Sequence, residues 1–378
     1  MSPRNSYLFF SYLMLLVTFI GPTEAFFSTP TPNTSFPKSK PMPDIVLTDE
    51  NGKVVRIPVK NIERDWTWED YTATGEFSCD LFVPENGQVK GCAFFMHGFS
   101  QYPVAYRKTL KEACEASNVA IVAVETGLLS SIVQEESKKV SFFKRKEAMQ
   151  FFLQRAVSED TKQCIRMVMG GSDVFAEYGV TKKAVGNKIA VMGHSMGGGL
   201  SFPVAADFSE IDYVFTMAPA FGVEDFDPIV KGVEERAPAN SMLLAGTWDL
   251  IAPEKKINSI SAAANNEKKN SSVVVDIERG LHTGFEDRLV LFNFKLSSVS
   301  NLLFLFGVID AALFLIIKIF SFIRTNTGQL EGSGILMEYL LKAMVANKSI
   351  DPEEAQAYLN DNLEDRFEQE FSFKYGQD

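Results

Sequence analysis

The segment GHSMG at residues 193–197 has the form G-x-S-x-G, which is typical of a nucleophilic serine on a strand-to-helix turn. It follows an apolar run at 188–192 and leads into two more glycines. A serine on a sharp strand-to-helix turn exposes its hydroxyl, provided that flanking glycines let neighbouring backbone pass closely. The pattern therefore predicts Ser195 as a nucleophile. It also predicts that the N–H of Met196, at the helix start, faces the oxyanion.

A serine hydroxyl attacks a carbonyl efficiently only when a base takes its proton, so a histidine partner is expected. The chain has three histidines. His282 follows the last predicted strand and is the expected base. His194 adjoins Ser195, and we expect its side chain to point away from the serine and to serve packing or hydrogen bonding. His97 follows an early strand, where the backbone N–H of Phe99 would be the second oxyanion donor.

The third member of such a triad is a carboxylate that orients the histidine. Asp249 fits this role because it lies between the serine and the histidine in the chain and follows an apolar run through the turn GTWD. Its structural alternative is a simple turn or cap carboxylate. The rival acids are Asp225 and Asp227, in an acidic loop, and Asp276, within a predicted strand.

These residues need a scaffold, and from 44 to 290 apolar runs of strand length alternate with helical segments. That alternation predicts an α/β fold with a mostly parallel central sheet and helices on both faces. We expect a helix at 106–117. The expected strands, the first two antiparallel, are at 54–59, 77–83, 91–96, 119–124, 188–192, 214–217, 241–245 and 272–277. The stretch 126–161 is helical in character and would carry a lid or part of a substrate wall.

Charge and cysteine content narrow the function classes. The net charge of −11, from 37 Lys and Arg against 48 Asp and Glu, argues against nucleic acid as a partner. Much of it lies near the C-terminus, which predicts an acidic helical tail at 326–378. The sequence implies no metal and no cofactor, and it identifies no protein partner. The four cysteines do not have the spacing of metal ligands, and disulfides and buried free thiols are both alternatives for them. They are Cys79, Cys92, Cys114 and Cys164.

The N-terminal region has the composition of a targeting sequence. Residues 1–25 read as a signal peptide, with Arg4 before an apolar run and small residues at a cleavage site. Residues 26–43 are rich in Ser, Thr and Pro and contain no acid, as in a transit peptide. Together they look like the presequence of a plastid protein in an alga with secondary plastids. The alternative is a secreted or endomembrane protein with a flexible start.

A strongly apolar segment follows the predicted hydrolase domain. Residues 302–323 are long enough to cross a bilayer, which takes about 20 residues. Asp310 and Lys318 would be costly there. We therefore expect 291–325 to be membrane-associated, and a true span, a membrane-surface helix and a lid-like helix pair stay open as alternatives.

Four segments resemble the α/β-hydrolases, and within them the chlorophyllase and dienelactone-hydrolase-like group. They are HGF after the first central strand, GHSMGG, the acid loop GTWD with its later proline, and the base loop LHTGF. The similarity covers about 75–290. Chlorophyllases often read GHSRGG, so Met196 departs from their pattern.

The resemblance implies an α/β-hydrolase fold and a serine ester hydrolase that acts through an acyl-enzyme. Its substrate would be an apolar or lipid-like ester, such as the phytyl ester of chlorophyll. The alternatives are a lipase or lysophospholipase, an acyltransferase, and a hydrolase fold kept as a binding module.

Overall fold

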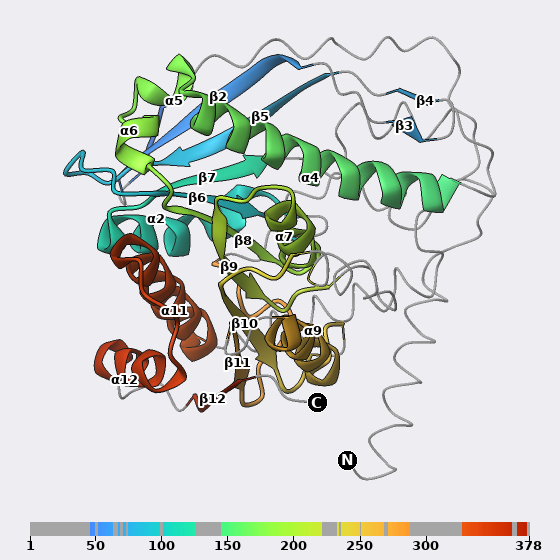
Figure 1. Cartoon of the computed structure of the whole chain (residues 1–378), viewed down its shortest axis with the longest axis vertical. Helices are drawn as coiled ribbons and strands as arrows, with labels where there is room; N and C mark the ends of the chain where they lie inside the picture. Colours follow the sequence, from blue (N-terminus) through green and yellow to red (C-terminus); the bar gives the residue numbers. More distant parts are fainter. Residues whose placement is uncertain are drawn as a thin grey trace, which may run out of the picture. The chain divides into compact units, whose positions relative to one another are not determined.

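The computed structural model describes most of one compact unit, which covers Asp44–Asp378 (Figure 1). The described residues are 46–49, 52–62, 67–68, 71–72, 75–98, 101–125, 145–220, 233, 236–249, 251–267, 271–287, 327–364 and 369–375. The predicted signal peptide (1–25), transit-like segment (26–43) and apolar segment (291–325) lie outside them.

The centre of the described part is a ten-stranded sheet in the order β1-β2-β5-β7-β6-β8-β9-β10-β11-β12. Neighbouring strands from β7 to β11 are parallel, and the strands at both ends of the sheet pair antiparallel. A separate pair joins β3 and β4. The strands are β1 (Val46–Asp49), β2 (Gly52–Ile62), β3 (Thr67–Trp68), β4 (Tyr71–Thr72), β5 (Gly75–Phe82), β6 (Cys92–Met96), β7 (Ala120–Glu125), β8 (Ile189–His194), β9 (Ile211–Met217), β10 (Asn240–Gly246), β11 (Ser272–Ile277) and β12 (Phe371–Tyr375).

The parallel strands form because their sequences are apolar on both faces. Every residue of β6, β8, β10 and β11 is buried, as a sheet covered by helices on both sides requires. Each predicted strand corresponds to an observed one, so the α/β class and the mostly parallel sheet are confirmed. The sequence did not predict β1, β3, β4 or β12.

Helices cover both faces of the sheet. The connection β6–α2–β7 steps one way along the sheet, whereas β7–α4–β8 steps the other way. Because such crossovers are right-handed, α2 and α4 lie on opposite faces. Contacts agree: α4 touches α7, and α2 touches α11, beside which it lies in Figure 1. The helices are η2 (Pro103–Tyr106), α2 (Arg107–Ser117), α4 (Arg145–Gly170), α5 (Asp173–Ala176), α6 (Lys182–Val185), α7 (Met196–Ala206), α9 (Glu254–Glu267), α11 (Thr327–Ala346) and α12 (Pro352–Asn362).

The C-terminal region differs from the predicted acidic tail. Helix α11 contacts α2, β8 and β9, and strand β12 extends the sheet beside β11. Lys374 of β12 pairs with Asp276 at 2.5 Å and with Glu254 at 2.9 Å. Residues 327–364 and 369–375 therefore belong to the same fold, and the domain does not end at 290. The physical reason is the buried apolar face of α11, which consists of Leu336, Met337, Leu340, Leu341 and Met344.

Part of the predicted lid-like stretch is a scaffold helix. Residues 145–161 belong to α4, and α4 as a whole contacts β6, β7 and α7. Residues 126–144 lie outside the described part. None of the described helices combines the length and apolar composition needed to cross a bilayer.

All four cysteines lie within the described residues and are buried, and none forms a disulfide there. Burial raises the pKa of the Cys92, Cys114 and Cys164 thiols above the usual range. These side chains therefore stay neutral and act as small apolar core residues.

The burial of α11 predicts a stability effect that a solvated tail would not show. Leu340→Ala should lower the free energy of unfolding by about 2–5 kcal/mol because it leaves a cavity in the core. Lys342→Ala, on the exposed face of the same helix, should cost less than about 1 kcal/mol. Urea unfolding measures both, and equal small effects would contradict the core placement of α11.

Candidate active site

Ser195 sits on a strained turn between β8 and α7. Its backbone has φ 54° and ψ −121°, a conformation that non-glycine residues rarely adopt. Three backbone hydrogen bonds hold it: its N–H donates to the carbonyl of Met217, and its carbonyl accepts from Gly199 and Ala220, each at 2.9 Å. The turn therefore holds the serine at the C-terminal edge of the parallel strands.

Two glycines make this turn possible. A Cβ on Gly193 would collide with the backbone of Gly197, two residues beyond the serine. A Cβ on Gly197 would collide with the backbone carbonyls of Met96 and His97, at the end of β6. Glycine is thus required where three backbone segments meet beneath the serine.

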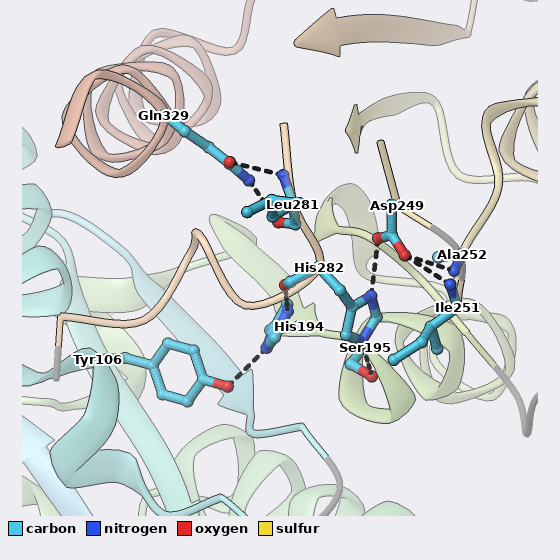
Figure 2. Close-up of polar contacts among 9 residues, drawn as sticks. All are labelled: Tyr106, His194, Ser195, Asp249, Ile251, Ala252, Leu281, His282 and Gln329. Carbon is cyan, nitrogen blue, oxygen red and sulfur yellow. Dashed lines mark hydrogen bonds and ion pairs between the residues drawn. The ribbon is translucent and has the colours of Figure 1, made fainter. Parts of the chain in front are cut away.

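The structure brings Ser195, His282 and Asp249 into one chain of hydrogen bonds (Figure 2). The distance from His282 Nε2 to the Ser195 Oγ is 2.7 Å, and the distance from His282 Nδ1 to the Asp249 Oδ2 is also 2.7 Å. A carboxylate only accepts hydrogen bonds, so Nδ1 carries the imidazole proton and its N–H donates a hydrogen bond to Asp249. Nε2 is then the acceptor for the serine proton, as a general base requires.

Asp249 is fixed on both of its oxygens. It follows β10, and its Oδ1 accepts the N–H groups of Ile251 and Ala252, each at 2.8 Å. The acid loop also lies tightly against the base loop, because a Cβ on Gly246 would fall 2.5 Å from the carbonyl oxygen of Gly280. This close contact sets the distance between the carboxylate and the imidazole.

Of the rival acids, Asp276 is described, and it does not join this site. Asp276 lies in β11, where it pairs with Lys374. Burial raises the pKa of Asp276, while its contact with Lys374 lowers it. Asp225 and Asp227 lie outside the described residues, as does Phe99, the expected second oxyanion donor. Met196 opens α7, whose first N–H groups have no acceptor within the helix.

His194 points away from Ser195 and forms two other hydrogen bonds. Its Nε2–H donates to the carbonyl of His282 at 2.8 Å, and its Nδ1 accepts from the Tyr106 hydroxyl at 2.6 Å. Burial, together with the nearby Glu286 carboxylate, raises the pKa of Tyr106 well above its usual value, so the hydroxyl keeps its proton. The expected hydrogen-bonding role of His194 is therefore observed. His97 is occupied by a contact at 2.8 Å to the carbonyl of Gly98.

The sequence alone did not identify two residues that lie near the site. Tyr106 had no predicted role, although it begins the expected helix. Gln329 of α11 contacts both backbone polar groups of Leu281, the residue before His282. The apolar spacing in α11 is the one sequence signal that could have placed this helix on the fold.

The arrangement fits the α/β-hydrolase fold. A parallel sheet carries the serine on a strand–turn–helix, and the acid and the histidine follow in that chain order on later loops. Within the described part of the chain, no group of three or more His, Cys, Asp or Glu side chains is arranged to hold a metal ion.

No protein-family model matches the chain, and no curated protein matches its sequence. Solved structures similar to it include a hyperthermophilic esterase from the archaeon Pyrobaculum calidifontis, 13% identical, with a TM-score of 0.43 over 71% of this chain and 83% of that one. The esterase domain of a Rhodothermus marinus protein is also 13% identical, with a TM-score of 0.39 over 71% and 97%.

The glycine requirement at the turn predicts a large stability effect. Gly197→Ala should lower the free energy of unfolding by more than about 3 kcal/mol, because the added methyl meets backbone rather than a movable side chain. Gly170→Ala is the control, since its methyl meets no atom within 4 Å among the described residues. Its effect should stay within about 1 kcal/mol. Thermal unfolding compares the two, and an unchanged Gly197→Ala protein would contradict this account of the turn.

Proposed function

We propose that this protein is a serine ester hydrolase that acts through an acyl-enzyme intermediate. The observation that carries the proposal is the buried hydrogen-bonded chain from Ser195 through His282 to Asp249. A hydrogen-bonded Ser–His–Asp chain with the serine on a strained turn is the arrangement that acyl transfer requires.

The proposed reaction has two steps. Ser195 Oγ attacks the ester carbonyl carbon while His282 Nε2 takes the hydroxyl proton, and Asp249 stabilises the resulting imidazolium. The N–H groups of Met196 and Phe99 would hold the oxyanion. His282 then gives its proton to the leaving alcohol, which departs as the acyl-enzyme forms. A water molecule then attacks the acyl carbon while His282 takes its proton. His282 returns that proton to the Ser195 Oγ as the bond between the acyl carbon and Oγ breaks, which releases the carboxylic acid and the free serine.

The proposed substrate is an apolar or lipid-like carboxylic ester. The exposed Trp248, which precedes Asp249 in the chain, supports an apolar substrate because it leaves a large apolar side chain in solvent next to the acid. The apolar segment predicted at 291–325 agrees with a substrate that resides in a lipid phase. Because the motifs resemble those of chlorophyllases, the more specific substrate that we propose is the phytyl ester of chlorophyll.

The proposal predicts that one serine carries the activity. Ser195→Ala should lower the hydrolysis rate of p-nitrophenyl butyrate by at least about 10³-fold, because it removes the oxygen that would form the acyl-enzyme. Ser201→Ala is the matched control: Ser201 is a buried serine of α7, the helix that follows Ser195, and it donates to the carbonyl of Gly197. Its loss should leave the rate within about threefold. The same assay with chlorophyll a distinguishes a chlorophyllase from a general lipid esterase. A wild type as inert as Ser195→Ala on both esters would overturn the proposal.

The contacts of Asp249 predict the effect of replacing its carboxylate by an amide. In Asp249→Asn the two backbone N–H donors keep the side-chain oxygen, so the new NH₂ group must face His282. It would force the imidazole proton onto Nε2, which can then no longer accept from Ser195, and kcat should fall about 10⁴-fold. The same substitution at the rival acid, Asp276→Asn, should keep kcat within about threefold, since Asp276 pairs with Lys374 instead. A larger loss at Asp276 than at Asp249 would show that the acid is misassigned.

A further inference from the structure

The backbone of the base loop is held by a side chain from the far end of the chain. Gln329, the third residue of α11, accepts the N–H of Leu281 on its Oε1 at 2.9 Å. Its Nε2 donates to the carbonyl of the same Leu281 at 2.8 Å. The buried amide therefore pairs with Leu281 as the backbone of a neighbouring strand would (Figure 2).

The base loop has no secondary structure of its own to hold this position. Residues 281–287 contain no helix or strand, and the backbone bonds described within them are two short-range ones, from Gly284 to Leu281 and from Glu286 to Thr283. The place of His282 relative to Ser195 therefore depends on contacts from outside the loop. His194 holds the carbonyl of His282, and Asp249 holds its imidazole. Gln329 holds the preceding residue at both of its backbone polar groups.

We infer that Gln329 is a positioning residue for His282, and that catalysis depends on α11 for this reason. The inference rests on the proposed function, since it assigns Gln329 a role in keeping the base within reach of Ser195. Helix α11 can serve as the support because its apolar face is buried against the same fold that carries the serine. A shift of about 1 Å in a catalytic group can cost about 100-fold in rate, so a loosened base loop slows the reaction even when the triad is intact.

Gly284 provides independent support for this arrangement. A Cβ on Gly284 would overlap the side-chain amide of Gln329, so the amide reaches Leu281 only because residue 284 is a glycine. The contact is therefore constrained from two places in the chain, and it can be disturbed from either of them.

The first variant removes the hydrogen bonds and keeps the bulk. Gln329→Met has similar length and volume but can neither donate to nor accept from Leu281 in this way. We expect kcat for p-nitrophenyl butyrate to fall about 10- to 100-fold, KM to stay within about threefold, and the Leu281 amide to exchange with solvent faster. The control is Ser333→Ala, a buried residue one turn further along α11 that bonds only to the carbonyl of Leu330 among the contacts described. It should leave kcat within about threefold.

The second variant acts from the loop and leaves α11 unchanged. Gly284→Ala should lower kcat as Gln329→Met does, because the new methyl displaces the amide. In Gln329→Ala the amide is absent and the space is open. Adding Gly284→Ala to that variant should therefore cause little further loss, and the two effects should not add. Additive losses would mean that the residues act separately and would overturn the inference.

A third readout separates this inference from the proposed function. A fluorophosphonate that labels reactive serines measures how well the base activates Ser195, without substrate turnover. Slower labelling of Gln329→Met than of the wild type and Ser333→Ala is the expected result. If Gln329→Met labels and turns over at the wild-type rates although its Leu281 amide exchanges faster, the inference about Gln329 is overturned and the proposed function stands. A wild type that neither labels nor hydrolyses either ester would overturn both.

Discussion

The strained backbone of Ser195 is the constraint around which the site is built. A non-glycine residue at φ 54° costs about 1–3 kcal/mol and persists only where its surroundings enforce it. Here the ends of β6, β8 and β9 enforce it together: Met217 accepts the N–H of Ser195, and the backbone of Met96 crosses directly against Gly197. The parallel pairing of β8 with β6 and with β9 holds these ends in register. The large apolar sheet thus stabilises one unfavourable torsion, and that torsion presents the hydroxyl to His282.

The base loop is held in a different way, because no strand or helix runs through it. Its supports come from separate parts of the chain: the acid loop meets it where Gly246 faces Gly280, and Gln329 of α11 pairs with Leu281. Near the end of the loop, Asp287 accepts from the Thr109 backbone N–H at 3.1 Å and donates its own N–H to Ala105 at 2.7 Å. The serine therefore depends on the sheet, whereas the histidine depends on contacts between loops and helices.

This difference explains how much could be predicted from the sequence. The strands around Ser195 appear as continuous apolar runs, and GHSMG is a local pattern, so both were readable without the structure. Asp249 and His282 followed from chain order. The contact between Gln329 and Leu281 joins residues 48 positions apart through one amide and leaves no local signal. The sequence predicts an acidic tail where helix α11 lies, because an apolar segment precedes this helix and acidic residues follow it. The signal for a packed helix is the helical spacing of its apolar residues.

The two histidines of the site show why chain order and contacts must be considered together. His194 and His282 have the same chemistry, and their rings lie 5.1 Å apart. Both nitrogens of His194 are occupied, Nε2–H by the carbonyl of His282 and Nδ1 by the Tyr106 hydroxyl, so it has no lone pair to offer the serine. His282 has its proton fixed on Nδ1 by Asp249, which leaves Nε2 facing Ser195. The partner of the second ring nitrogen thus distinguishes a general base from a structural imidazole. His194 contributes by holding the backbone carbonyl of His282, whose Nε2 faces Ser195.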